Sequence, residues 1–154
     1  MAKLAPLAKI ILLLAIAAAA GMASYFTGRQ TCTEVYRHDI SLKINGKILN
    51  AQTAVTPAQQ ERGLSGRQCL SAGNAMLFAF PDAGYYYFWM KDMNFPIDIV
   101  WLSPAKQVVW INPDTAPSTY PGSFVSPSPA KYVLELKAGQ ATALGLGTGS
   151  YVSF

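Results

Sequence analysis

Four short apolar segments follow one another in the middle of the chain, and each gap between them contains a proline. The segments are Ala75–Phe80, Tyr85–Met90, Ile97–Leu102 and Gln107–Asn112. Short segments rich in aromatic and branched residues, bounded by turn-forming residues, are typical of β-strands rather than of helices. Uninterrupted apolar runs such as Met76–Phe80 predict strands buried on both faces, or a curled sheet with a filled interior.

Two more strands are expected before this region. Residues Ile40–Ile44 alternate between apolar and polar, as the residues of a half-buried strand do. Asn45 and Gly46 come next, and this pair is a strong signal for a two-residue hairpin turn. We therefore expect Ile48–Val55 to form the partner strand of a hairpin.

A short helix is expected between this hairpin and the apolar segments. Thr56 is a suitable N-cap, Pro57 fits the first helical position, and Gln59 has the spacing of a capping box. Gly63 should end the helix after about two turns. A second short helix is expected over Ala138–Leu144.

The last third of the sequence completes the expected sheet. Pro113–Pro129 is rich in proline and serine, which predicts a long surface loop. Tyr132–Leu136 has the pattern of a strand, and Tyr151–Phe154 is expected to close the sheet. The predicted fold is therefore α+β and mostly β. We expect a compact, curled, barrel-like sheet, antiparallel or mixed, with one or two short helices.

Residues 1–26 have the pattern of an export signal. Lys3 and Lys9 provide positive charge, Ile10–Ala20 is wholly apolar, and Gly21–Ala23 supplies small residues for a cleavage site. The sequence leaves two outcomes open. The segment is either cleaved as a signal peptide or retained as an apolar helix that anchors the protein in the membrane, because the apolar run is long enough to approach a span.

Both outcomes predict the same domain organisation and the same side of the membrane. Residues 27–39 form a connector, and residues 40–154 form a single β-rich domain. The domain is expected to be exported to the periplasm or another extracytoplasmic compartment, either released or anchored to the cytoplasmic membrane.

The chain has only two cysteines, Cys32 and Cys69. In an exported domain an even pair predicts a disulfide. His38 is the only histidine, so one chain cannot supply the four Cys and His ligands of a structural zinc site. We expect no metal and no cofactor.

Half of the net charge of +4 comes from the N-terminal segment. Without Lys3 and Lys9, ten basic residues remain beside eight acidic ones, and no run of Lys or Arg occurs. A nucleic-acid-binding protein normally has a concentrated basic surface. The sequence therefore argues against nucleic acid as a partner, and we expect a monomer.

Five blocks of the sequence resemble an uncharacterised family. They are Glu61–Arg67, Ala75–Phe80, Phe88–Asp92, Pro96–Val100 and Ala130–Leu136. Together and in this order they resemble the family named domain of unknown function 192, over a stretch from about Ile40 to Phe154. The resemblance implies a compact β-rich domain, often behind a signal peptide or anchor. It implies no reaction, because the family has none established.

The preferred interpretation is a small binding or interaction module for an unknown small molecule or protein. The segment Tyr85–Asp98, with the Pro-rich loop, is the expected contact surface, because its aromatic side chains alternate and a small domain cannot bury them all. The candidate binding residues are Arg62, Arg67, Trp89, Lys91, Asp98, Lys131 and Glu135.

An enzyme of unknown reaction is the first alternative, although the sequence favours binding over catalysis. Asp98 and Glu135 would be the acid–base groups, with Arg62 and Lys91 beside them. Asp98 lies within an apolar strand, so alternation places it on the opposite face from its neighbours. A structural role, facing outward or paired with a cation, is the competing interpretation.

A Cu(I)-handling protein is the second alternative. Met90 and Met93 would offer soft thioether ligands in an oxidising compartment, with His38 nearby. Methionines in a β-rich core also simply fill space, which is the competing interpretation.

Overall fold

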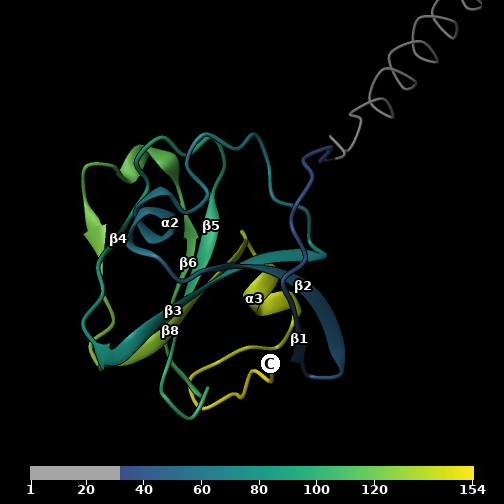
Figure 1. Ribbon diagram of the computed structural model, residues 1–154, viewed down its shortest axis with the longest axis vertical. Helices are drawn as coiled ribbons and strands as arrows, with labels where there is room; N and C mark the ends of the chain where they lie inside the picture. The colour runs from purple at the N-terminus through teal and green to yellow at the C-terminus, as the bar shows by residue number, and fades with distance from the viewer. Residues whose placement is uncertain (1–31) are drawn as a thin grey trace, which may run out of the picture. The chain divides into compact units, whose positions relative to one another are not determined.

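The computed structural model describes residues 32–154, and a six-stranded mixed sheet lies at the centre of this part (Figure 1). Within the sheet only one neighbouring pair, the second and third strands listed here, is parallel. In order across the sheet the strands are β1 (Ile40–Ile44), β2 (Lys47–Ala54), β3 (Asn74–Gly84), β8 (Ala130–Lys137), β5 (Ile97–Leu102) and β6 (Val108–Thr115).

Two short helices accompany the sheet, as predicted. α2 (Pro57–Arg62) connects β2 to β3, and α3 (Gln140–Ala143) follows β8. The predicted capping box of α2 is confirmed: Thr56 Oγ1 accepts a hydrogen bond from the Gln59 amide at 3.3 Å, and Gln59 Oε1 accepts one from the Thr56 amide at 3.0 Å. The helix ends where Gly63 donates its amide to the Gln59 carbonyl.

Apolar side chains cover the sheet on both faces. One core contains Leu42, Val100 and Leu136 from the strands, with Leu144 and Val152 from the C-terminal region. The opposite core is built around larger side chains, including Phe78, Phe88, Met90, Ile99, Trp101 and Val133. Every residue of β5 is buried. Strands covered on both faces have continuous apolar sequences, which explains the uninterrupted runs.

The expected barrel-like curl is wrong, because the sheet is open. β1 and β6 are its two edges, and they do not pair with each other. The apolar runs suggested a filled interior, but they arise from two separate cores. Irregular segments supply much of the covering: Leu64 and Leu70 lie in the loop after α2, while Leu146 and Val152 lie beyond α3.

The predicted strand Tyr85–Met90 is mostly wrong. Only β4 (Phe88–Trp89) is extended there, and it pairs with β7 (Ser123–Phe124) in a separate two-stranded sheet. β3 instead continues to Gly84, past Pro81, where its register against β8 shifts. A bulge of this kind tolerates a proline within a strand.

The long loop predicted over residues 113–129 is only partly a loop. β6 extends to Thr115, and a 3₁₀ turn, η1 (Pro117–Thr119), precedes β7. Tyr151–Phe154 does not close the sheet. It forms single bridges, Ser153 to Lys43 on β1 and Tyr151 to Gln107 beside β6.

The predicted signal peptide or anchor lies in residues 1–31, outside the described residues. Within 32–154 the structure contains no helix long and apolar enough to cross a membrane.

Candidate binding cavity

Asp98 is a structural residue at the heart of the sheet. Its side chain is fully buried and accepts three backbone amides: Asp114 at 2.8 Å, Gly139 at 3.0 Å and Ala141 at 2.8 Å. These bonds join the end of β6 and the start of α3 to β5. Asp98 therefore neither faces outward nor pairs with a cation, and it lies on the face opposite Ile97 and Ile99.

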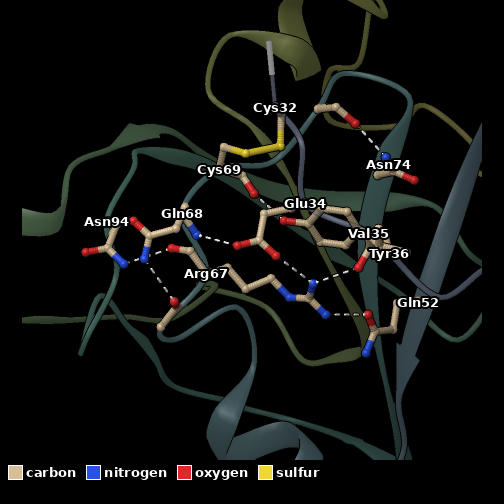
Figure 2. A network of polar contacts seen from close by, with 12 residues as sticks. Cys32, Glu34, Val35, Tyr36, Gln52, Arg67, Gln68, Cys69, Asn74 and Asn94 are labelled. Atoms are coloured by element: carbon tan, nitrogen blue, oxygen red, sulfur yellow. Dashed lines mark hydrogen bonds and ion pairs between the residues drawn. A yellow bond between two sulfur atoms is a disulfide. The ribbon is translucent and has the colours of Figure 1, made fainter. Parts of the chain in front are cut away.

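Arg67 holds the connector against the domain, as Figure 2 shows. Its guanidinium donates to the Val35 carbonyl at 3.1 Å and to Gln52 Oε1 at 3.0 Å. It also pairs with Glu34 at 3.4 Å and lies over the ring of Tyr36, 4.3 Å from the centroid. These contacts use both terminal nitrogens of the Arg67 guanidinium, so its role here is attachment.

The predicted Cys32–Cys69 disulfide is present and completes this attachment (Figure 2). The two Cα atoms are 5.6 Å apart. Tyr36 donates its hydroxyl to the Cys69 carbonyl, and Glu34 accepts the Gln68 amide at 3.0 Å. Burial raises the pKa of the Tyr36 phenol to about 12. Disulfides of this kind persist in oxidising, extracytoplasmic compartments.

A cavity of about 380 Å³ lies on the face of the sheet that carries the larger aromatic side chains. This volume falls within the range of about 300–1,000 Å³ that is typical of small-molecule sites. We call it the aromatic cavity. Its lining residues come from α2 and the loop after it, from β3, from the segment 86–93 and from β8. In Figure 1, α2 and β4 lie close together at this side of the sheet.

Six of the fifteen residues that line the cavity are aromatic. Phe80 and Tyr86 stack with their ring centroids 3.5 Å apart, and Tyr86 donates its hydroxyl to the Asp82 carbonyl at 2.8 Å. Phe78 and Phe88 meet edge to face at 4.8 Å. Trp89 also lines the cavity and remains 42% exposed. The wall therefore combines buried and half-buried rings with two exposed ones, Tyr87 and Trp89.

Glu135 lines the aromatic cavity from the central strand β8. It lies opposite Met76 on β3 and Ile99 on β5, both of which belong to the same core. Its side chain is only 5% exposed, and Oε2 is buried without a hydrogen-bond partner among the described residues. Burial raises the pKa of this carboxyl to about 8. A carboxyl group without a partner in such a place is costly and therefore a functional candidate.

Gly63 places no side chain against this buried carboxyl. A β-carbon at position 63 would lie 3.8 Å from Oε2 of Glu135 and 3.2 Å from Cζ of Phe78. The backbone at Gly63 has φ of 48° and ψ of −130°, which favours glycine. The end of α2 can therefore approach the sheet closely.

Arg62 connects the aromatic cavity to two neighbouring hollows. One, of about 300 Å³, is lined by Arg62, Trp89, Lys91 and Asp92 among others. The second, of about 220 Å³, contains Arg37, Arg62 and Arg67. Arg62 is exposed, so its charge lies at the rim rather than beside Glu135.

The structure thus brings three of the predicted binding residues, Arg62, Trp89 and Glu135, to one cavity. Lys91 lies in the adjacent hollow, whereas Lys131 is half-buried on β8 and lines none of these three. Binding by these residues stays a prediction.

Of the residues proposed for copper, the two methionines are buried and His38 does not line the cavity. Met90 and Met93 lie in the aromatic core, and only Met93 lines the cavity. His38 is exposed, and its Nε2 is 3.0 Å from Ser41 Oγ.

Several cavity residues were not singled out from the sequence. Phe80 and Gly63 each depend on contacts between distant segments, and single-sequence patterns do not encode such contacts. Tyr86, in contrast, lies within the segment Tyr85–Asp98 that was predicted as the contact surface. The only available signal was the Arg62–Gly63 pair within the first family-like block.

The chain belongs to the family DUF192, described as Uncharacterized ACR, whose profile matches residues 40–154. A comparison with curated protein sequences finds no match. The chain is similar in structure to a Sinorhizobium meliloti 1021 protein provisionally described as a transcription regulator, with TM-score 0.68 and 28% identity, over 73% of this chain and 89% of that one. A protein of unknown function from Novosphingobium aromaticivorans DSM 12444 shares the fold, with TM-score 0.71 and 23% identity over 81% and 94% of the two chains.

Proposed function

We propose that this protein is an exported or membrane-tethered binding module whose small-molecule ligand occupies the aromatic cavity. The observation that carries the proposal is the buried carboxyl of Glu135, which has no partner within residues 32–154 and lies at a wall that contains stacked aromatic rings. Apolar cavities with a few polar groups are the usual form of small-molecule sites.

The arrangement favours binding over the enzyme alternative. That alternative required Asp98, Glu135, Arg62 and Lys91 to converge around one pocket. Asp98 is occupied by three amides on the other face of the sheet, and Lys91 belongs to the adjacent hollow. Glu135 therefore lacks the second acid–base group that the alternative assigned to it.

The exported location rests on two features. The N-terminal sequence has the pattern of an export signal, and the Cys32–Cys69 disulfide requires an oxidising compartment to persist.

The test is to purify the full-length protein from its envelope in mild detergent and to identify bound small molecules by native mass spectrometry. Trp89→Ala should remove the bound molecule without unfolding the domain, because the indole lines the cavity and is partly exposed. Trp110→Ala is the matched control, since Trp110 is also 42% exposed but lies on β6 outside the cavity. Equal retention of the molecule by both variants would refute the proposed site.

A further inference from the structure

Most uncharged polar side chains of the aromatic cavity already have partners within the protein. Gln60 donates its amide to the Ala79 carbonyl at 3.0 Å, and Ser65 donates its hydroxyl to the Lys91 carbonyl at 2.8 Å. Glu135 differs, because it takes part in none of the side-chain hydrogen bonds or ion pairs found within residues 32–154. The carboxyl is therefore the group whose interactions a ligand would complete.

We infer that the ligand of this cavity carries an organic ammonium group, which pairs with Glu135 while its apolar part lies against the aromatic wall. This inference rests on the proposed function, because it names the ligand class of the same cavity. The shared chemistry is that of a free amine or of a lysine side chain from a peptide.

The wall of the cavity suits a cation better than its apolar character suggests. The faces of aromatic rings attract ammonium groups, and this attraction increases when the ammonium loses its water. Phe78, Phe88 and Trp89 line the cavity together with Glu135. A carboxylate within a set of aromatic rings offers both an ion pair and ring faces to one ammonium.

The charges at the rim do not oppose a cation. Glu61 and Arg62 both line the cavity from α2, are exposed, and carry opposite charges. An anionic ligand would find only Arg62, and it would leave Glu135 buried without a partner. That outcome is unfavourable, since a buried polar group that stays unpaired is costly.

The groups around Glu135 make its titration simple to follow. Met76 on β3 and Ile99 on β5 flank it and do not titrate. From the connector, Tyr36 is the nearby titratable group that senses its charge, and the pKa of that phenol is about 12. Other ionisable groups in the surroundings are Glu61 and Arg62 on α2, Arg67, which lies over the Tyr36 ring, and Glu34, which pairs with Arg67.

Ammonium binding must therefore release a proton near neutral pH. Burial raises the pKa of Glu135 to about 8, so the empty site is mostly protonated at pH 7. An ion pair needs the carboxylate, and affinity should rise about tenfold per pH unit from pH 6 to 7.5 and then level off above 8. A neutral ligand that accepts a hydrogen bond from the protonated acid would bind more weakly as the pH rises.

Calorimetric titration of the full-length protein tests this inference. The probes are phenethylammonium, its neutral isostere 2-phenylethanol, the anion 3-phenylpropionate, and Nα-acetyl-lysine amide as the peptide-like source. We expect an ammonium probe to bind at least tenfold more tightly than the alcohol at pH 8, and to release roughly one proton at pH 7. The stronger of the two ammonium probes identifies the source.

Glu135→Gln should remove the preference for ammonium, whereas Asp82→Asn, at an exposed carboxylate that lines none of the three hollows, should change affinity less than threefold. The pH profile of the unmodified protein needs no variant, so it decides the question even if Glu135→Gln folds poorly. Equal binding of alcohol and ammonium, or weaker ammonium binding at higher pH, would overturn the ammonium inference while leaving the cavity as a binding site. Failure of every probe, together with an empty protein by native mass spectrometry, would overturn both proposals.

Discussion

Glu135 and Gly63 lie against each other across the aromatic cavity, so that a β-carbon at position 63 would be 3.8 Å from the carboxyl oxygen Oε2. The two residues come from the central strand β8 and from the end of α2. Because position 63 has no side chain, the end of α2 and the Glu135 carboxyl line the same cavity in close proximity. The predictions below depend on this arrangement and on the contacts that support it.

Replacing Gly63 with alanine should destabilise the domain and narrow the cavity. The positive φ strains any residue with a side chain, at a cost of about 1–3 kcal/mol, and the new β-carbon would press on Phe78 at 3.2 Å. Urea unfolding of the two proteins measures the difference. Gly73→Ala is the control, because nothing lies within 4 Å of its β-carbon position. Equal stability of both variants would contradict the strain argument.

Stability should fall as the pH rises through the titration range of Glu135. Burial raises the pKa of this carboxyl from 4.5 to about 8, so the folded state holds a proton that the unfolded state releases. The stabilisation is complete below pH 4.5 and is lost towards pH 8, by at most about 1.4 kcal/mol per pH unit. Glu135→Gln should remove this slope. Urea unfolding of the unmodified protein and of Glu135→Gln from pH 5 to 8 measures this slope. The same slope in both proteins would contradict its assignment to Glu135.

Removing the carboxylate of Asp98 should be among the most damaging single changes in the domain. Asp98→Ala leaves three backbone amides without their acceptor, one of them at the buried Ala141, and we expect a loss of roughly 3 kcal/mol or more. Asp82→Asn is the control, since the Asp82 side chain is exposed and makes no such bonds in the described structure. Circular dichroism during urea unfolding gives the difference, and a loss below 1 kcal/mol would disprove the structural role.

Loss of the disulfide should weaken the attachment of the connector. A bond that closes a loop with a sequence separation of 37 stabilises by roughly 2–4 kcal/mol, mainly through the unfolded state. Cys32→Ser with Cys69→Ser should therefore lower the unfolding midpoint. Reductant should lower the midpoint of the unmodified protein to a similar extent and leave the double variant unchanged. A reductant effect on the double variant would show that another process is being measured.

The sequence predicts local structure here better than it predicts the site. The turn at Asn45-Gly46 and the capping box at Thr56 depend on neighbours in the chain, and both are found. The barrel-like curl was wrong because an apolar run indicates that a strand is buried on both faces but not which segments cover it. In this protein the strands are covered partly by irregular segments, such as the loop containing Leu64 and Leu70.

The two candidate carboxylates also could not be told apart from the sequence. Glu135 was identified as a strand carboxylate that could do acid–base work, and the structure places it in the cavity. Asp98 has the same signature, but amides from residues 114, 139 and 141 satisfy it. Only the fold shows whether a buried carboxylate has hydrogen-bond partners. The partners of Asp98 are backbone amides, which every sequence provides, so no sequence pattern reveals them.

The C-terminal segment influences how this sheet meets other copies of itself. Ser153 exchanges two hydrogen bonds with Lys43 on the β1 edge, and the Val108 amide on the β6 edge donates to the Ser150 carbonyl at 2.8 Å. Exposed strand edges are templates for intermolecular pairing and aggregation. Residues 149–154 occupy part of each edge, so they block intermolecular strand pairing there and oppose fibre-like assembly of an otherwise open sheet.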